Sequence, residues 1–345
     1  MGLREYIIRR LLLLIPIMFG VVILIFAVLQ LIPPESRAAL YITSPKQFQQ
    51  IKEIIAQYGL NDPVYMQFVR YVTEIFKGNF GYSESFGEMV GPGLLARLPA
   101  TLEISIYAAP LIILFGIWFG TTAAVHRDKM PDHLSRVASI LGTSLPTFFL
   151  GLLMIAIFVA QLRWTTTGRA TNLGAVLLAI NRGSFHSYTG LLTVDSLLNG
   201  DVMLFLDAVK HLILPVLVLV FINSAVMVRV TRSSMLEALS KTYIVAARAK
   251  GLSKKETIYK HARRNALIPV VTMSGMMVGG MLTGLVITET VFNFPGVGNY
   301  AATGAQHFDV SIVAAYAMFS ALVFVIANLL VDILYGYIDP RIRLG

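Results

Sequence analysis

Cysteine is absent from this 345-residue chain. The absence excludes disulfide bonds, thiolate metal sites and a cysteine nucleophile. Charge is also scarce, because Asp, Glu, Lys and Arg make up only 14% of the sequence, whereas soluble domains carry about 25%. Hydrophobic residues make up 56%, and the mean hydropathy is +0.71. This composition indicates an integral membrane protein.

Two motifs of enzymes are missing as well. The chain has no G-x-x-x-x-G-K-[ST] sequence, and a phosphate-binding loop needs both its glycines and its lysine. It also lacks H-E-x-x-H, and its six histidines do not follow the spacing of metal ligands. We therefore expect a non-catalytic chain that binds no cofactor or metal and hydrolyses no ATP itself.

Long hydrophobic runs are what the chain has in abundance. A helix crosses a bilayer with about 20 apolar residues, in a range of roughly 17–25. Six charge-free runs are long enough: Leu11–Ile32, Ile104–Val125, Val137–Leu162, Leu212–Val228, Asn265–Thr288 and Val310–Val331. Lipid offers no partner to open backbone groups, so each run is predicted to be helical. The predicted fold class is an all-α membrane protein with six transmembrane helices, the first of them retained rather than cleaved.

Prolines fall inside or at the ends of several runs, where each is expected to kink or begin a helix. Pro146 lies in the third run, and Pro269 is expected to begin the fifth helix. The runs contain no Asp, Glu, Lys or Arg, although ion-driven carriers often need such charges inside the membrane.

The short loops predict the orientation of the chain in the membrane. Lys and Arg gather before the first run, after the second and, above all, after the fourth, whereas the loop after the fifth run has none. An excess of basic residues marks the cytoplasmic side, so both termini are predicted to be cytoplasmic. The same bias accounts for the net charge of +9, and no nucleic-acid partner is expected.

Two longer segments are then predicted to lie outside. In the first, Pro33–Glu103, two helices are expected close to Ser44–Tyr58 and Asp62–Lys77, because each has a starting Ser-Pro or Asp-Pro pair and a terminating glycine. Val64, Phe68, Val72 and Ile75 are expected to form the apolar stripe of the second helix. The other outside segment is 163–210, where Leu191–Leu206 is the best helix candidate.

The basic loop after the fourth run contains VAARAKGLSKKE, residues 245–256. Leu236–Lys250 is predicted to be one helix that ends at Gly251, a residue suited to a left-handed backbone. Ser253 and Glu256 have the spacing of a capping box and predict a second short helix. One face of the first helix is expected to carry Leu239, Tyr243, Ala246, Ala247 and Lys250. From the residues alone, this loop either binds a partner or is attracted to anionic lipid headgroups.

This loop resembles the E-A-A-x-x-x-G motif of ABC importer permeases. Val245-Ala246-Ala247 and Gly251 match the motif, with valine in place of glutamate, and Ile268-Pro269 matches its end. Arg232–Leu236 and His261–Pro269 are similar to the B-type permease of dipeptide, oligopeptide and nickel importers. Further matches run in order along nearly the whole chain: Arg9–Leu11, Gly59–Pro63, Gly78–Gly81, Leu98–Glu103, Ser144–Phe148, Glu289–Phe292, Pro295–Gly298 and Asp339–Arg343.

The resemblance implies the type I ABC importer permease fold and a division of the chain. Residues 1–97 would hold the first transmembrane helix and a small helical extracytoplasmic domain, residues 98–336 the permease core with its coupling loop 237–269, and residues 337–345 a cytoplasmic tail. The implied contacts with an ATPase are Tyr243, Ala246, Ala247, Arg248, Lys250, Gly251 and Ser253.

The resemblance also implies partners and a location. The partners are a second permease, two cytoplasmic ATPase subunits that bind ATP and Mg, an extracytoplasmic solute-binding protein and membrane lipid. The location is the plasma membrane of a prokaryote, and the implied solutes are peptides, nickel chelates or oligosaccharides. A secondary transporter and a receptor-like membrane protein remain the alternatives from other classes.

Overall fold

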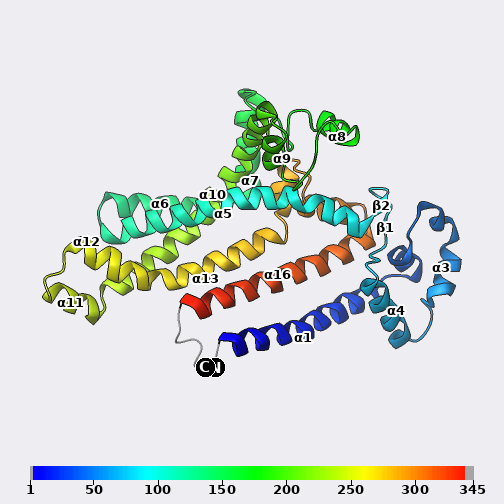
Figure 1. Ribbon diagram of the computed structural model, residues 1–345, viewed down its shortest axis with the longest axis horizontal. Helices are drawn as coiled ribbons and strands as arrows, with labels where there is room; N and C mark the ends of the chain where they lie inside the picture. The colour runs from blue at the N-terminus through cyan, green and yellow to red at the C-terminus, as the bar shows by residue number, and fades with distance from the viewer. Residues whose placement is uncertain (1–2, 339–345) are drawn as a thin grey trace.

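The computed structural model describes residues 3–338, and long helices dominate it. The longest are α1 (Leu3–Leu29), α5 (Val90–Val125), α10 (Val202–Leu239), α13 (Arg263–Leu282) and α16 (Val310–Ile338). Helices α1, α5, α13 and α16 run roughly along the long axis of the molecule, and α10 crosses it obliquely (Figure 1). Within the described residues, five helical runs are long and apolar enough to cross a membrane, or six if one bent pair counts as a span. This confirms the predicted all-α membrane fold.

The bent pair replaces the continuous third span that the sequence predicted. Helices α6 (Met130–Ser144) and α7 (Thr147–Met154), the latter extended by a π-helical turn at Ile155–Gln161, meet at an angle of 97°. Leu145 at the junction is extended, with φ −85° and ψ 124°. The following Pro146 disfavours a helical backbone at this residue. Pro146 therefore ends one helix and begins the next.

Other prolines lie within continuous helices. Pro99 and Pro110 are inside α5, which begins at Val90, and Pro215 is inside α10. Pro269 is inside α13, so the prediction that it begins the fifth helix is wrong. That helical run begins at α12 (Lys254–Glu256) and passes through a π-helical turn, Thr257–Ala262, into α13. The fifth membrane helix thus includes residues 254–264, which the sequence had placed in the preceding loop.

Between α1 and α5 the chain forms a small helical insertion, residues 33–89 (Figure 1). Its elements are α2 (Pro34–Arg37), η1 (Ala38–Tyr41), η2 (Pro45–Gln50), α3 (Ile51–Tyr58), α4 (Val64–Phe76) and the antiparallel strands β1 (Tyr82–Ser83) and β2 (Glu88–Met89). Both predicted helices are present, although the first begins as a 3-10 helix. Ser44 forms a capping box with Gln47, and Gly59 ends α3 with φ +56°.

The predicted apolar stripe of α4 is confirmed only in part. Phe68, Val72 and Ile75 are half-buried, and Phe68 and Ile75 pack against the hydrophobic cluster that includes Phe26. Val64 is 57% exposed, whereas Gln67, Tyr71 and Glu74 are buried. Gln67 can be buried because its amide oxygen accepts a 2.7 Å hydrogen bond from the buried guanidinium of Arg37. A hydrophobic pattern could not reveal this orientation, because a polar partner on another element determines it.

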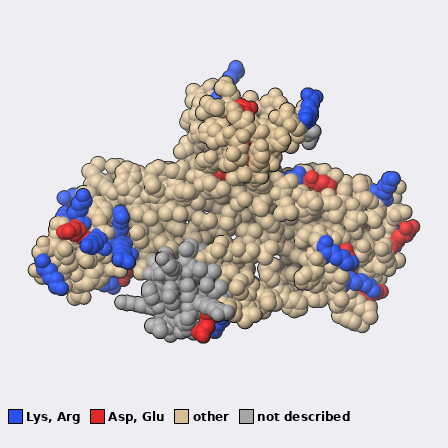
Figure 2. Space-filling model, viewed as in Figure 1, with Lys and Arg blue, Asp and Glu red and all other residues tan. Residues whose placement is uncertain are grey.

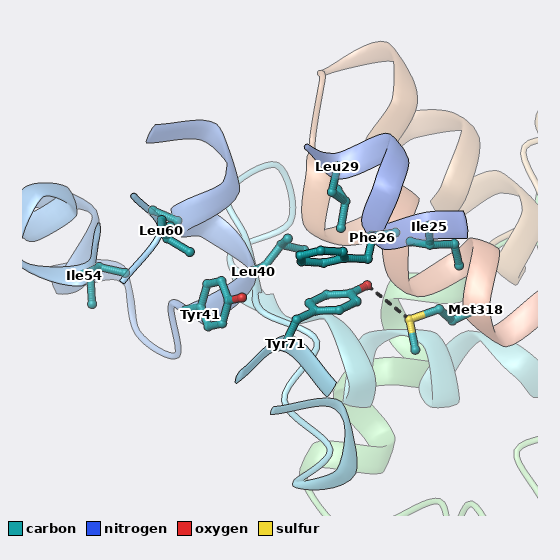
Figure 3. Packing of buried hydrophobic residues seen from close by; sticks show 11 residues of the cluster. Ile25, Phe26, Leu29, Leu40, Tyr41, Ile54, Leu60, Tyr71 and Met318 are labelled. Carbon is teal, nitrogen blue, oxygen red and sulfur yellow. Dashed lines mark hydrogen bonds between the residues drawn. The ribbon is translucent and has the colours of Figure 1, made fainter. Parts of the chain in front are cut away.

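The insertion is joined to the long helices by a hydrophobic cluster (Figure 3). Phe26 of α1 lies 5.5 Å from Tyr71 of α4, measured between ring centroids. The Tyr71 hydroxyl lies 3.5 Å from the sulfur of Met318 in α16. Three elements far apart in the sequence therefore meet at one aromatic side chain.

Four further short helices lie in the connections between the long ones. Helices α8 (Leu173–Asn181) and α9 (Leu192–Leu198) lie between α7 and α10, and α14 (Val286–Val291) and α15 (Val297–Gln306) between α13 and α16. The predicted helix Leu191–Leu206 is interrupted after Leu198, where Gly200 has φ +75°. Residues 339–345, most of the predicted tail and the matched Asp339–Arg343, lie outside the described residues.

We expect Phe26→Ala to loosen the insertion from α1. Truncating a buried phenylalanine costs about 3–5 kcal/mol, and this side chain is 7% exposed. Hydrogen exchange measured by mass spectrometry should become faster in α4. Leu24→Ala is the matched control, because Leu24 lies on the same helix and is 64% exposed. Equal exchange in the two variants would contradict the packing.

Candidate functional site

The predicted partner-binding loop lies at one end of the bundle. Helix α11 (Thr242–Ala249) and α12 project there beyond the ends of the neighbouring helices (Figure 1). Figure 2 shows Lys and Arg gathered at this end, next to a wide middle zone of uncharged residues. The predicted single helix Leu236–Lys250 is wrong, because α10 ends at Leu239 and α11 begins at Thr242.

The inner face of α11 packs on its own chain. Ile244 is fully buried, and Ala247 is 7% exposed. Ile244 belongs to a hydrophobic cluster that draws on four other elements, with members Ala124, Met235, Ala238, Ile258, Ala262 and Ala266. The cluster holds α11 against α5, α10 and the beginning of the α12–α13 run. A displacement of α11 would therefore act on all of them.

The outer face of α11 is exposed. Tyr243 is 38% exposed and Val245 62%, and Ala246, Arg248 and Lys250 are exposed as well. The predicted common face was therefore wrong in two members, since Ala247 points into the protein and Leu239 lies in α10, where it packs against the cluster around Ile244. The small side chain of Ala247 allows α11 to pack closely against the rest of the chain. The small side chain of Ala246 protrudes little from the exposed face, so another protein could approach the helix backbone there.

Gly251 ends α11 in the predicted left-handed conformation, with φ +81°. The N–H of Leu252 donates to the carbonyl of Ala247 at 3.3 Å, and the N–H of Gly251 to that of Arg248 at 3.0 Å. This is the Schellman pattern at a helix C-terminus. A Cβ atom at Gly251 would meet nothing within 4 Å, so the backbone angle alone requires glycine here.

Ser253 and Glu256 form the predicted capping box. The Ser253 hydroxyl accepts from the N–H of Glu256 at 3.2 Å, and the Glu256 carboxylate accepts from the N–H of Ser253 at 3.1 Å. The helix that begins here is not a separate short one, because it continues through the π-helical turn to Leu282. The turn at Gly251 is therefore joined directly to a membrane helix.

A buried ion cluster lies at the same end of the bundle, and the sequence analysis missed it. Asp132 of α6 is fully buried, and its carboxylate accepts from Nε of Arg232 in α10 at 2.5 Å and from Arg136 at 2.7 Å. Breaking such a pair by removing one partner leaves an uncompensated buried charge. The cluster therefore fixes α6 to α10 close to α11. In the sequence, Asp132 is an acidic residue within a basic loop, and this pattern does not indicate its partner.

The matched Glu289–Gly298 segment has a structural role at the other end of α13. The buried Glu289 carboxylate accepts from the Thr101 hydroxyl at 2.7 Å and from the N–H groups of Leu285 and Asn299 at 3.1 and 2.8 Å. Burial raises the pKa of Glu289, and these hydrogen bonds oppose the rise. A Cβ atom at Gly296 would lie 2.4 Å from the carboxylate, so glycine leaves room for it.

The described residues include no group of three or more His, Cys, Asp or Glu side chains that could hold a metal ion. The arrangement at α11 is instead that of a contact surface. It is a short helix with an exposed outer face and a buried inner face, joined at both ends to long helices. Such a surface suits mechanical coupling to another protein.

The comparisons with known proteins give the class of the chain. Residues 112–344 match the family described as binding-protein-dependent transport system inner membrane component, and residues 3–105 match the N-terminal region of such membrane components. The chain therefore belongs to the inner membrane components of binding-protein-dependent transport systems. It is the permease component of an ABC importer, and this excludes the secondary transporter and the receptor-like protein left open by the sequence.

Several permeases of peptide transport systems are similar to this chain over nearly their full length. The di/tripeptide transport system permease protein DppB of Pseudomonas aeruginosa (strain UCBPP-PA14) is 40% identical over 340 residues, 98% of each chain. The dipeptide transport system permease protein DppB of Escherichia coli (strain K12) is 36% identical over 342 residues, again 98% of each. The oligopeptide transport system permease protein AppB of Bacillus subtilis (strain 168) is 34% identical, covering 98% of this chain and 99% of its own.

Substitutions at adjacent alanines should separate the two faces of α11. Ala247→Leu adds volume at a buried position and should lower the free energy of unfolding by about 1–3 kcal/mol. Ala246→Leu adds the same volume on the exposed face and should change it by less than about 0.5 kcal/mol. Thermal unfolding of the purified protein in detergent measures both. Equal destabilisation by the two variants would contradict the assigned faces.

Proposed function

We propose that this chain is the permease subunit of a peptide importer and that α11 is where its ATPase acts. The observation that carries the proposal is the exposed face formed by Tyr243, Val245, Ala246 and Lys250, on a helix whose other face is buried in the same chain. Arg248, Gly251 and Ser253 position or border this face, and Ala247 supports it from within.

Force applied to this face has three routes into the membrane. The hydrophobic cluster around Ile244 leads to α5 and α10, and the turn at Gly251 leads through the capping box of Ser253 into the run to Leu282. The Arg232–Asp132 pair leads from α10 to α6. For ATP to drive the change, the ATPase has to bind one arrangement of these helices more tightly than another.

The proposal includes the partners and the division of labour. ATP and Mg would bind two separate ATPase subunits, and this chain would be non-catalytic. A second permease would complete the translocation path, and a solute-binding protein would deliver the solute. Peptides are the proposed solutes because the similar proteins are named as dipeptide, di/tripeptide and oligopeptide permeases.

The proposed location is the plasma membrane of a prokaryote, with α11 and both termini in the cytoplasm. Its support is the bias of Lys and Arg toward the end that bears α11 (Figure 2), and the start of α1 lies nearer that end than the end of α1 does (Figure 1). The helical insertion would then lie outside. Residues 1–97 would form the first helix and the outside domain, and 98–336 the permease core with coupling loop 237–269.

The coupling role predicts that Gly251→Val abolishes uptake of a labelled dipeptide. Valine in a left-handed conformation costs about 1–2 kcal/mol, and this strain would disturb the turn that joins α11 to α12. Ala246→Leu should have the same result by obstructing the docked surface. Gly78→Val is the matched control, since Gly78 has φ +77° and equally open surroundings in the insertion.

The readouts for these variants are dipeptide uptake and co-purification of the ATPase. Gly251→Val and Ala246→Leu should reach the membrane in normal amounts, and Gly78→Val should keep its uptake. A loop that only binds anionic lipid predicts the reverse, with neutral substitutions silent and replacement of Lys254, Lys255 and Lys260 harmful. Normal uptake by both neutral variants would refute the coupling role.

Orientation is tested by single cysteines, because the chain has none of its own. A membrane-impermeant maleimide should label Phe76→Cys and Tyr188→Cys in intact spheroplasts, since these side chains are 88% and 62% exposed. Lys254→Cys should be labelled only after the membrane is permeabilised. Labelling of residue 254 in intact spheroplasts would reverse the proposed topology.

A further inference from the structure

A second surface feature is a groove between α5 and the α12–α13 run. Its volume is about 800 Å³, and α5 supplies most of its walls. The walls include Leu114, Ile117 and Trp118, and the exposed fractions of Leu114 and Trp118 are 58% and 59%. The groove therefore presents an open apolar surface along helices that cross the membrane.

One end of the groove carries a positive charge. Among the described residues that line it, Arg263 is the only charged one. The Arg263 guanidinium carbon lies 5.3 Å from the ring centroid of Tyr259, which also lines the groove. Among the side chains that the structure describes, no carboxylate forms an ion pair with Arg263. The guanidinium thus lies beside an aromatic ring and has no counter-ion among these side chains.

We propose that the groove binds one anionic phospholipid. Its phosphate would lie against Arg263, and an acyl chain would cover Leu114, Ile117 and Trp118. Each part of the lipid has a matching part of the groove, since a guanidinium suits a phosphate and the apolar wall suits the chain. Free phosphate would leave the apolar walls uncovered.

The test uses the assembled transporter reconstituted in phosphatidylcholine vesicles that contain a trace of photoreactive lipid. The probe is phosphatidylglycerol with a diazirine in one acyl chain, and phosphatidylcholine with the same diazirine is its control. Mass spectrometry gives the labelling of α5 and α13 peptides relative to α1, whose exposed residues such as Ile15 and Leu24 report ordinary lipid contact.

For the wild type, we expect this ratio to be about fivefold higher with phosphatidylglycerol than with phosphatidylcholine, as one basic residue near an anionic surface gives. Arg263→Gln should remove the preference, and Arg263→Lys should keep most of it. Arg264→Gln is the matched control, because it removes the same charge from an exposed neighbour that does not line the groove.

Three results would overturn the proposal. Equal ratios for the two probes in the wild type would show ordinary lipid contact only. Labelled α1 with unlabelled α5 and α13 would show that another protein, such as the second permease, covers the groove. Loss of the preference in Arg264→Gln as much as in Arg263→Gln would show a diffuse charge effect. Labelling of α1 reports membrane insertion of every variant.

Discussion

A backbone N–H or C=O group inside lipid has no partner other than its own chain, and the architecture of this permease follows from that constraint. The long helices satisfy their backbone groups internally, even where Pro99, Pro110, Pro215 or Pro269 removes one donor. The sharp break is confined to Leu145-Pro146, where two helices meet at 97°. Short helices and turns gather in the segments that connect the long ones.

Within that frame, small residues decide which helices approach closely. A Cβ atom at Gly116 would lie 2.1 Å from the Met227 side chain, and one at Gly120 would lie 2.5 Å from Thr231. These glycines of α5 therefore let α10 pack against its backbone, as small residues do between membrane helices. The cluster around Ile244 also includes residues of α5 and α10, so a displacement of α11 would act on these two closely packed helices.

Both proposed surfaces meet at the run from Lys254 to Leu282. Its first turn is held by the capping box next to α11, and its π-helical turn carries Tyr259 beside the groove. π-helical turns often occur at functional sites because they alter the direction of neighbouring side chains. Coupling to an ATPase and contact with lipid would thus act on one helix, a few turns apart.

The sequence alone determined the features that depend on composition or on neighbouring residues. These are the membrane helices, the glycine stops at Gly59 and Gly251, the helix start at Ser44 and the capping box at Ser253. The motif around Gly251 also located the candidate site. The membrane helices were predictable because they follow from local composition. The glycine stops and caps were predictable because they depend on backbone angles and hydrogen bonds between residues a few positions apart.

Only the tertiary structure decided which face each element buries. It turned Ala247 inward and Ala246 outward, buried Gln67 beside Arg37, and brought Asp132 to Arg232. It also made the fifth membrane helix begin at Lys254 rather than at Pro269. The physical reason is that burial and ion pairing depend on partners distant in the sequence, and no local pattern specifies those partners.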